Sequence, residues 1–217
     1  MNSSADSRRL VGKREDLKHA KDLLSKIPRA KSDQRQRLLL AAAVTKLMRR
    51  VPIVVGGTAE AFWAGGAYHP TDLDLCPRPD TSDVAALHAA GLVRSGRHWV
   101  RDDLPVAVEF PGSGEDIKRT VRVVVERVAV QIIACEDLYL ERVRQATVSW
   151  PHEDVSFDGA FAIALTNYAT MDWEYVRARI SEAGKNESAV GATMPLVNRR
   201  VRARARRRAI TAREEPQ

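Results

Sequence analysis

The stretch IVVGGTAEAFWAGGAYHPTDLDLC, residues 53–76, decides how this chain folds. Apolar and β-branched residues predict two strands, over 53–55 and 72–76, and a short helix over 58–64 between them. Two prolines end the second strand. Strand, glycine turn, helix and strand in this order predict an α/β lobe built on a sheet.

Two acids and two glycines in this stretch indicate nucleotide chemistry. Side chains alternate across a strand, so Asp72 and Asp74 point to one face of the second strand. At a rise of about 3.3 Å per residue their carboxylates lie about 7 Å apart, which suits hard divalent cations. Gly56 and Gly57 leave backbone N–H groups open to a phosphate, and Thr58 adds a hydroxyl at a helix start.

The rest of the chain divides into helical ends and a strand-rich middle. Apolar periodicity and turn residues predict helices over 5–26, 33–50, 82–90, 136–147, 155–168 and 172–183, and strands over 98–102, 105–110, 120–125 and 128–133. A tight turn is expected at 126–127 and a loop over 184–195. We therefore expect a sheet lobe over 1–134, a helical lobe over 135–197 and a basic tail or helix over 198–217.

Composition places the chain among globular proteins. Of its 217 residues 44% are hydrophobic and 29% charged, and no apolar run approaches the roughly 18 residues that span a membrane. The polar N-terminus lacks an apolar signal core, so we expect a cytoplasmic protein without a membrane partner. The two cysteines give neither zinc spacing nor a disulfide framework.

The C-terminal segment is strongly basic. The net charge is +7, and residues 198–217 carry eight arginines against Glu214 and Glu215. Such a segment can bind nucleic acid through its phosphates. A solvated terminus and a contact with an acidic partner are the alternatives.

The order of parts around Gly57 and Asp72 resembles the nucleotidyltransferase superfamily signature. Fourteen residues separate these two positions, a length similar to that in the subgroup of MenT-type and AbiEii-type toxins of bacterial toxin–antitoxin systems. The resemblance implies an α/β (α+β) nucleotidyltransferase fold, with a mixed sheet lobe, flanking helices and a C-terminal helical lobe. It also implies Mg²⁺ as cofactor and a nucleoside triphosphate (NTP) as co-substrate.

The superfamily usually places a third carboxylate on a later strand, and Glu109 in VAVEFP is the best match. An acid between Val108 and Phe110 in an apolar strand calls for a metal or a basic partner. The alternative is an exposed position on an edge strand. Asp102 and Asp103 are poorer candidates because they lie at a predicted turn. The implied metal ligands are therefore Asp72, Asp74 and Glu109.

Two further catalytic residues are implied in the helical lobe. ACEDLYLERVRQA resembles the helix after the sheet in this subgroup, where Arg142 matches a basic residue that faces phosphates. Asp158 matches a later acidic residue. Arg142 can instead pair with acids of its own helix, and Asp158 can simply stabilise a helix N-terminus. Arg144 and Asp154 are rivals for the two positions.

The resemblance implies transfer of a nucleoside monophosphate from an NTP to an acceptor hydroxyl, with the 3′ end of tRNA as the acceptor. The enzyme would block translation as a toxin restrained by an antitoxin, and the basic C-terminal segment would bind the tRNA. Two alternatives remain open. One is nucleotidylation of a small molecule or a protein hydroxyl, and the other is a non-catalytic nucleotide- or RNA-binding module.

Overall fold

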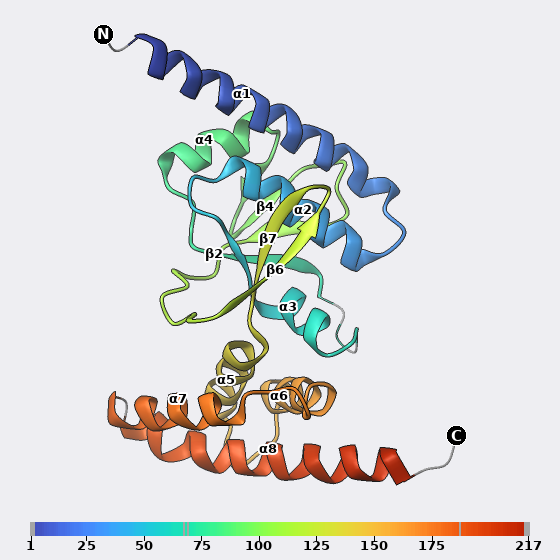
Figure 1. The fold of residues 1–217 in the computed structure, drawn as a ribbon, viewed down its shortest axis with the longest axis vertical. Helices are drawn as coiled ribbons and strands as arrows, with labels where there is room; N and C mark the ends of the chain where they lie inside the picture. Colours follow the sequence, from blue (N-terminus) through green and yellow to red (C-terminus); the bar gives the residue numbers. More distant parts are fainter. Residues whose placement is uncertain (1–2, 67, 69, 187, 215–217) are drawn as a thin grey trace. The chain divides into compact units, whose positions relative to one another are not determined.

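The structure is a computed structural model that describes residues 3–66, 68, 70–186 and 188–214 (Figure 1). The chain divides into two compact units. The sheet unit comprises Met1–Thr58 and Pro70–Ile132, and the helical unit comprises Ala59–His69 and Ile133–Gln217. The sequence places 59–69 in the first lobe, whereas the structure groups this segment with the helices that follow the sheet.

The sheet unit contains seven strands with both parallel and antiparallel neighbours. Their order is β3-β4-β5-β2-β1-β7-β6. The strands are β1 Ile53–Val54, β2 Asp72–Cys76, β3 Val93–Ser95, β4 His98–Val100, β5 Ala107–Glu109, β6 Thr120–Val125 and β7 Val128–Ile133. Because β1–β7 and β2–β5 are parallel while β1–β2, β3–β4 and β4–β5 are antiparallel, the predicted mixed α/β fold is confirmed.

Helices flank this sheet. The sheet unit holds α1 Ser3–Lys26, the 3₁₀ turn η1 Ile27–Arg29, α2 Asp33–Leu47 and α4 Thr81–Ala89. α1 packs along α2, as Figure 1 shows, and α2 packs on the sheet at β2 and β6. Leu39, Leu40 and Val44 of α2 are buried, so this helix supplies much of the core.

The predicted turn at 126–127 is confirmed. Glu126 and Arg127 both have positive φ, at 47° and 68°, which is the geometry of the two-residue hairpin turn that follows the twist of a sheet. The strand Val93–Ser95 was not predicted. Its three residues are all exposed, so they lack the apolar alternation that marks a half-buried strand.

The helical unit is built from α5 Cys135–Ala146, α6 Val155–Thr166, α7 Trp173–Asn186 and α8 Ser188–Glu214. The helix α3, Gly56–Trp63, begins in the sheet unit and ends in this one. α8 packs against α5, α6 and α7. Residues 198–214 are therefore part of a packed helix. Among the described residues, no helix has both the length and the apolarity required to cross a membrane.

The predicted loop over 184–195 is wrong, because α7 and α8 occupy most of it. Gly184 and Gly191 explain the error. A Cβ atom on Gly191 would lie 2.3 Å from the Cα of Gly184, so the two helices touch backbone to backbone there. Glycines that suggest a loop in the sequence instead allow a close helix contact, a tertiary effect that local propensity does not contain.

Candidate metal-binding and active site

The strands β2 and β5 bring the predicted acids together. They are parallel neighbours, and their register pairs Asp74 with Glu109. Leu73 and Leu75 are fully buried on one face of β2, while Asp72 and Asp74 are half-buried on the other. The alternation of β2 is thus confirmed, and the predicted third carboxylate lies on the strand directly beside the aspartates.

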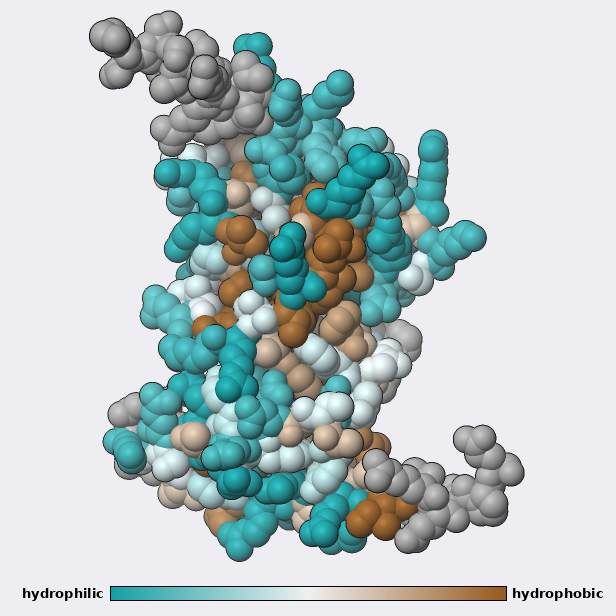
Figure 2. All heavy atoms as spheres, in the orientation of Figure 1, coloured by the Kyte–Doolittle hydropathy of each residue, from teal (hydrophilic) through white to brown (hydrophobic). Residues whose placement is uncertain are grey.

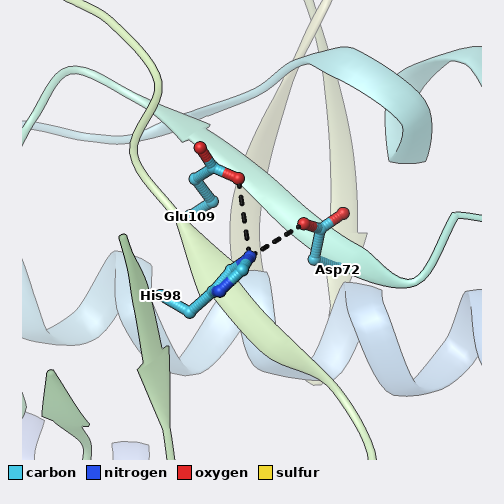
Figure 3. Close-up of side chains that lie close together, drawn as sticks. All are labelled: Asp72, His98 and Glu109. Atoms are coloured by element: carbon cyan, nitrogen blue, oxygen red, sulfur yellow. Dashed lines mark ion pairs between the residues drawn. The ribbon is translucent and has the colours of Figure 1, made fainter. Parts of the chain in front are cut away.

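A histidine that the sequence analysis did not identify completes a cluster with two of these acids. In Figure 3 the imidazole of His98 points between Asp72 and Glu109. Its Nε2 lies 3.4 Å from Asp72 Oδ2 and 3.6 Å from Glu109 Oε2. The exposed Arg97 adds a positive charge, with its Nε 3.3 Å from Glu109 Oε2.

The signal for His98 was present in the sequence. Strands predicted over 98–102 and 105–110 around a turn pair antiparallel, and such pairing sets His98 across from Glu109, the register that β4 and β5 adopt. Side-chain alternation then places the histidine on the face opposite Trp99, which is buried. Considering cross-strand pairs would therefore have found it.

The donor set fits a divalent cation. One ligand atom from each of Asp72, His98 and Glu109 lies within 4.8 Å of the others, and all three residues are half-buried. Ligands at about 2.0–2.3 Å from one ion stand up to about 4.5 Å apart, so small side-chain adjustments would close the cluster around a metal. Two carboxylates suit Mg²⁺, whereas the imidazole nitrogen favours transition metals such as Mn²⁺ or Zn²⁺.

The glycine corner holds the β2 acids in place. Gly56 has φ of +55°, and a Cβ atom there would lie 2.1 Å from Asp74 Oδ2. The N–H of Gly57 donates to that same Oδ2 at 3.2 Å. The buried hydroxyl of Thr58 donates to the carbonyl of Asp72 at 3.0 Å. The contacts seen for Gly57 and Thr58 thus position the aspartates, and their predicted role in holding phosphates stays a prediction.

Arg142 lies in the helical unit, in a buried ion pair. Its Nε is 2.7 Å from Oε2 of Glu60 on α3, and its Nη1 donates to Gln145 at 2.7 Å. The carboxylate of Glu141 on its own helix lies 3.6 Å away, and burial raises the pKa of Glu141. Acids of its own helix were the predicted alternative partners of Arg142, whereas Glu60 comes from a helix 82 residues earlier and no local pattern indicates it.

Arg142 and Asp158 line one pocket of about 420 Å³ in the helical unit, together with Glu60, Tyr68 and Gln145. The two residues predicted in this lobe therefore lie at a common cavity. The Asp158 side chain is 68% exposed, with Arg204 Nη1 3.9 Å from its Oδ1. Both residues thus border the same cavity, with Asp158 exposed and Arg142 half-buried and bonded to Glu60 and Gln145.

The rival acid at the start of α6 has a structural role. Asp154 is the N-cap of α6 and accepts from the N–H groups of Ser156 and Phe157, each at 3.0 Å. Asp154 is therefore the capping residue, while Asp158 lies in the first turn of α6, where its charge can still stabilise the helix N-terminus. Arg144, the rival of Arg142, lies exposed on α5 and is not among the residues that line the pocket.

No protein-family model matches this chain, and no curated protein matches its sequence. Among solved structures, the chain is similar to an antigenic nucleotidyltransferase-like protein from Paracoccidioides brasiliensis. The two share 11% sequence identity with a TM-score of 0.47, over 75% of this chain and 94% of that one.

Proposed function

We propose that this chain is a metal-dependent nucleotidyltransferase that moves a nucleoside monophosphate from an NTP to an acceptor hydroxyl. The register of β2 and β5 carries the proposal, because it sets Glu109 beside the Asp72–Asp74 pair. Carboxylates on neighbouring strands can hold divalent ions, and two such ions can stabilise the attacking and leaving oxygens of a phosphoryl transfer. The resemblance of residues 53–76 to the nucleotidyltransferase signature supports the same reaction class.

Each residue has a defined task in the proposed reaction. Asp72, Asp74 and Glu109 would hold divalent ions, with His98 as a further ligand. Bound ions would neutralise the triphosphate and lower the pKa of the acceptor hydroxyl. The backbone at Gly56 and Gly57, with Thr58, would orient the phosphates.

In the proposed reaction one bond forms and one breaks at the α-phosphorus of the NTP. The acceptor oxygen forms a bond to the α-phosphorus, and the bond from that atom to the bridging oxygen breaks. Pyrophosphate leaves with the electron pair, and the hydroxyl proton passes to a carboxylate of the cluster. Arg142 would offset the negative charge of the phosphates, and Asp158 would bind the acceptor or orient it.

We further propose the 3′ end of tRNA as the acceptor, which would make the protein a cytoplasmic, translation-blocking toxin with a cognate antitoxin. Support comes from the spacing that resembles MenT-type and AbiEii-type toxins and from the arginines of α8. Small molecules and protein hydroxyls are the alternative acceptors. A non-catalytic nucleotide- or RNA-binding module is the alternative without chemistry.

Transfer of label from α-labelled NTPs tests the reaction. The protein is incubated with each NTP, Mg²⁺ or Mn²⁺, and total tRNA, total protein or small-molecule extract in separate reactions. We expect label on tRNA, and a loss of about 100-fold or more in Asp72→Asn and Asp74→Asn. Asp102→Asn is the matched control, because Asp102 is exposed at a turn. Label that survives both site substitutions, or no label on any acceptor, contradicts the proposal.

A further inference from the structure

A second and larger pocket of the helical unit lies away from Arg142. It has a volume of about 1010 Å³ and is bounded by the end of α6, the start of α7 and the C-terminal half of α8. Phe161, Tyr168 and Trp173 line it, and all three are half-buried, so each ring keeps part of its surface open. Three aromatic rings that are partly exposed to solvent at one pocket are available to contact a ligand.

The rings are held in fixed positions. The centroids of Tyr168 and Trp173 lie 5.2 Å apart, and the indole N–H of Trp173 donates to the Tyr168 carbonyl at 3.0 Å. Behind them the fully buried Tyr139 meets Trp173 edge to face at 5.6 Å. A rigid aromatic platform loses little entropy when a flat ligand stacks on it.

Arginines of α8 lie at two of the aromatic rings. The guanidinium carbon of Arg202 is 4.8 Å from the Trp173 ring centroid, and that of Arg204, which also pairs with Glu153, is 4.5 Å from the Phe161 centroid. Arg206 and Arg208 line the pocket and are exposed. Among the side chains that the structure describes, the lining includes no Asp or Glu. Figure 2 shows hydrophilic residues along α8 and a hydrophobic patch near its C-terminal end, where Ile210 is 47% exposed.

We propose that this pocket binds unpaired bases of single-stranded RNA. Bases stack on aromatic rings and on guanidinium planes, while exposed arginines attract the phosphates between them. An acidic protein would need the cations but not the aromatic platform, and an apolar peptide would need the rings but not the cations. The inference rests on the proposed function in one respect, since an RNA acceptor brings such bases to the protein.

Fluorescence anisotropy with a labelled ten-nucleotide RNA tests the pocket on the full chain, without NTP and with EDTA present. We expect Tyr168→Ala to weaken binding about 5- to 150-fold, the measured worth of one stacked base, and Tyr168→Phe to bind as wild type. We also expect an abasic ribose-phosphate strand of equal length to bind wild type far more weakly. This last comparison needs no variant and so does not depend on folding.

The arginines have a matched control on the same helix. Arg206→Ala/Arg208→Ala removes two lining charges, and the slope of log affinity against log salt should fall by about 1.4. Arg199→Ala/Arg207→Ala removes two exposed charges that do not line the pocket, and should change affinity less. The inference is overturned if the two double variants lose the same affinity for RNA, or if the abasic strand binds as tightly as RNA. It is also overturned if polyglutamate displaces the RNA from wild type but not from Tyr168→Ala, because the pocket would then prefer an acidic peptide.

This experiment separates the pocket from the chemistry. Asp72→Asn should bind RNA as wild type while it loses label transfer. If RNA binds with the expected preference for bases but no label is transferred, the proposed reaction is contradicted while the RNA-binding pocket is supported. If label is transferred to RNA but the protein binds RNA and the abasic strand equally well, the base-binding pocket is contradicted while the reaction is supported.

Discussion

At the residue scale, His98 is the candidate ligand that we expect to set the metal preference of this cluster. Removal of the imidazole should lower the affinity for Mn²⁺ more than the affinity for Mg²⁺, because nitrogen ligands favour transition metals. We expect His98→Ala to lower Mn²⁺ affinity about tenfold or more and Mg²⁺ affinity less. Titration calorimetry measures both constants, with the exposed His152 changed to Ala as control. An equal loss for both ions would contradict the expected metal preference, and unchanged affinity for both would show that His98 is not a ligand.

Substitution of Gly56 should lower activity and metal binding more than it lowers the free energy of unfolding. In Gly56→Ala the new methyl meets Asp74 Oδ2, whereas Gly66, with φ of +82°, has nothing within 4 Å of its Cβ position. Both substitutions pay the left-handed strain of about 1–2 kcal/mol. Only Gly56→Ala should also abolish label transfer and weaken metal binding. Similar activity in the two variants, compared at matched thermal stability, would contradict this.

At the element scale, α8 has a buried stripe and a basic side. Val197, Val201 and Ala205 are fully buried at helical spacing, while Arg206, Arg207 and Arg208 are exposed. The arginine-rich segment is thus both part of the core and a charged surface. Deleting 198–217 would remove both at once, so single substitutions are needed to separate them.

Val201→Ala should destabilise the protein by about 2 kcal/mol, because it removes two buried methyl groups and leaves a small cavity. Arg207→Ala, on the exposed side of the same helix, should change stability by less than about 0.5 kcal/mol. Urea denaturation followed by circular dichroism measures both. If the two values agree within error, α8 is not packed as described.

Local pattern explains which elements could be predicted. β2 and the β6–β7 hairpin follow from alternation and turn residues, which are properties of neighbouring positions. The contact between Gly184 and Gly191 and the pairing of Glu60 with Arg142 join residues on different helices, so no local rule contains them. The sequence likewise indicated Asp72, Asp74 and Glu109 as one set, but His98 depends on the β4–β5 register.

At the scale of the whole molecule, positive charge lies in two segments of the chain. Residues 1–58 carry 14 Lys and Arg against 5 Asp and Glu, an excess larger than that of the C-terminal segment. In the sheet unit, Lys26, Arg29, Lys31 and Arg35 line a pocket of about 690 Å³ together with Asp22 and Glu126, which pair with Lys26 and Arg35. A polyanion would compete with these ion pairs there, so non-specific affinity should depend on the N-terminal cations less than their number suggests.

The helical unit is not one continuous segment, and a fragment should reveal this. Residues 133–217 alone lack Trp63, whose indole donates to the Ile133 carbonyl and whose own carbonyl accepts from Asn167, each within 2.9 Å. They also lack Glu60, so the half-buried Arg142 loses its closest carboxylate and keeps only Glu141 and Gln145 on its own helix. We expect the fragment to show little cooperative melting, and a fusion that adds residues 56–69 to recover it. A fragment that melts like the full chain would contradict this.

The passage of α3 from one compact unit to the other also has a consequence during synthesis. Residues 59–69 are synthesised at least 73 positions before Arg142 and at least 98 positions before Asn167, so this segment waits for its partners while the rest of the sheet is made. Phe62 and Trp63 belong to this segment, and until its partners have been made their rings would be exposed and could bind chaperones. A segment that belongs to the helical unit is thus made before the whole of the rest of that unit, and it depends on late-made residues for its packing.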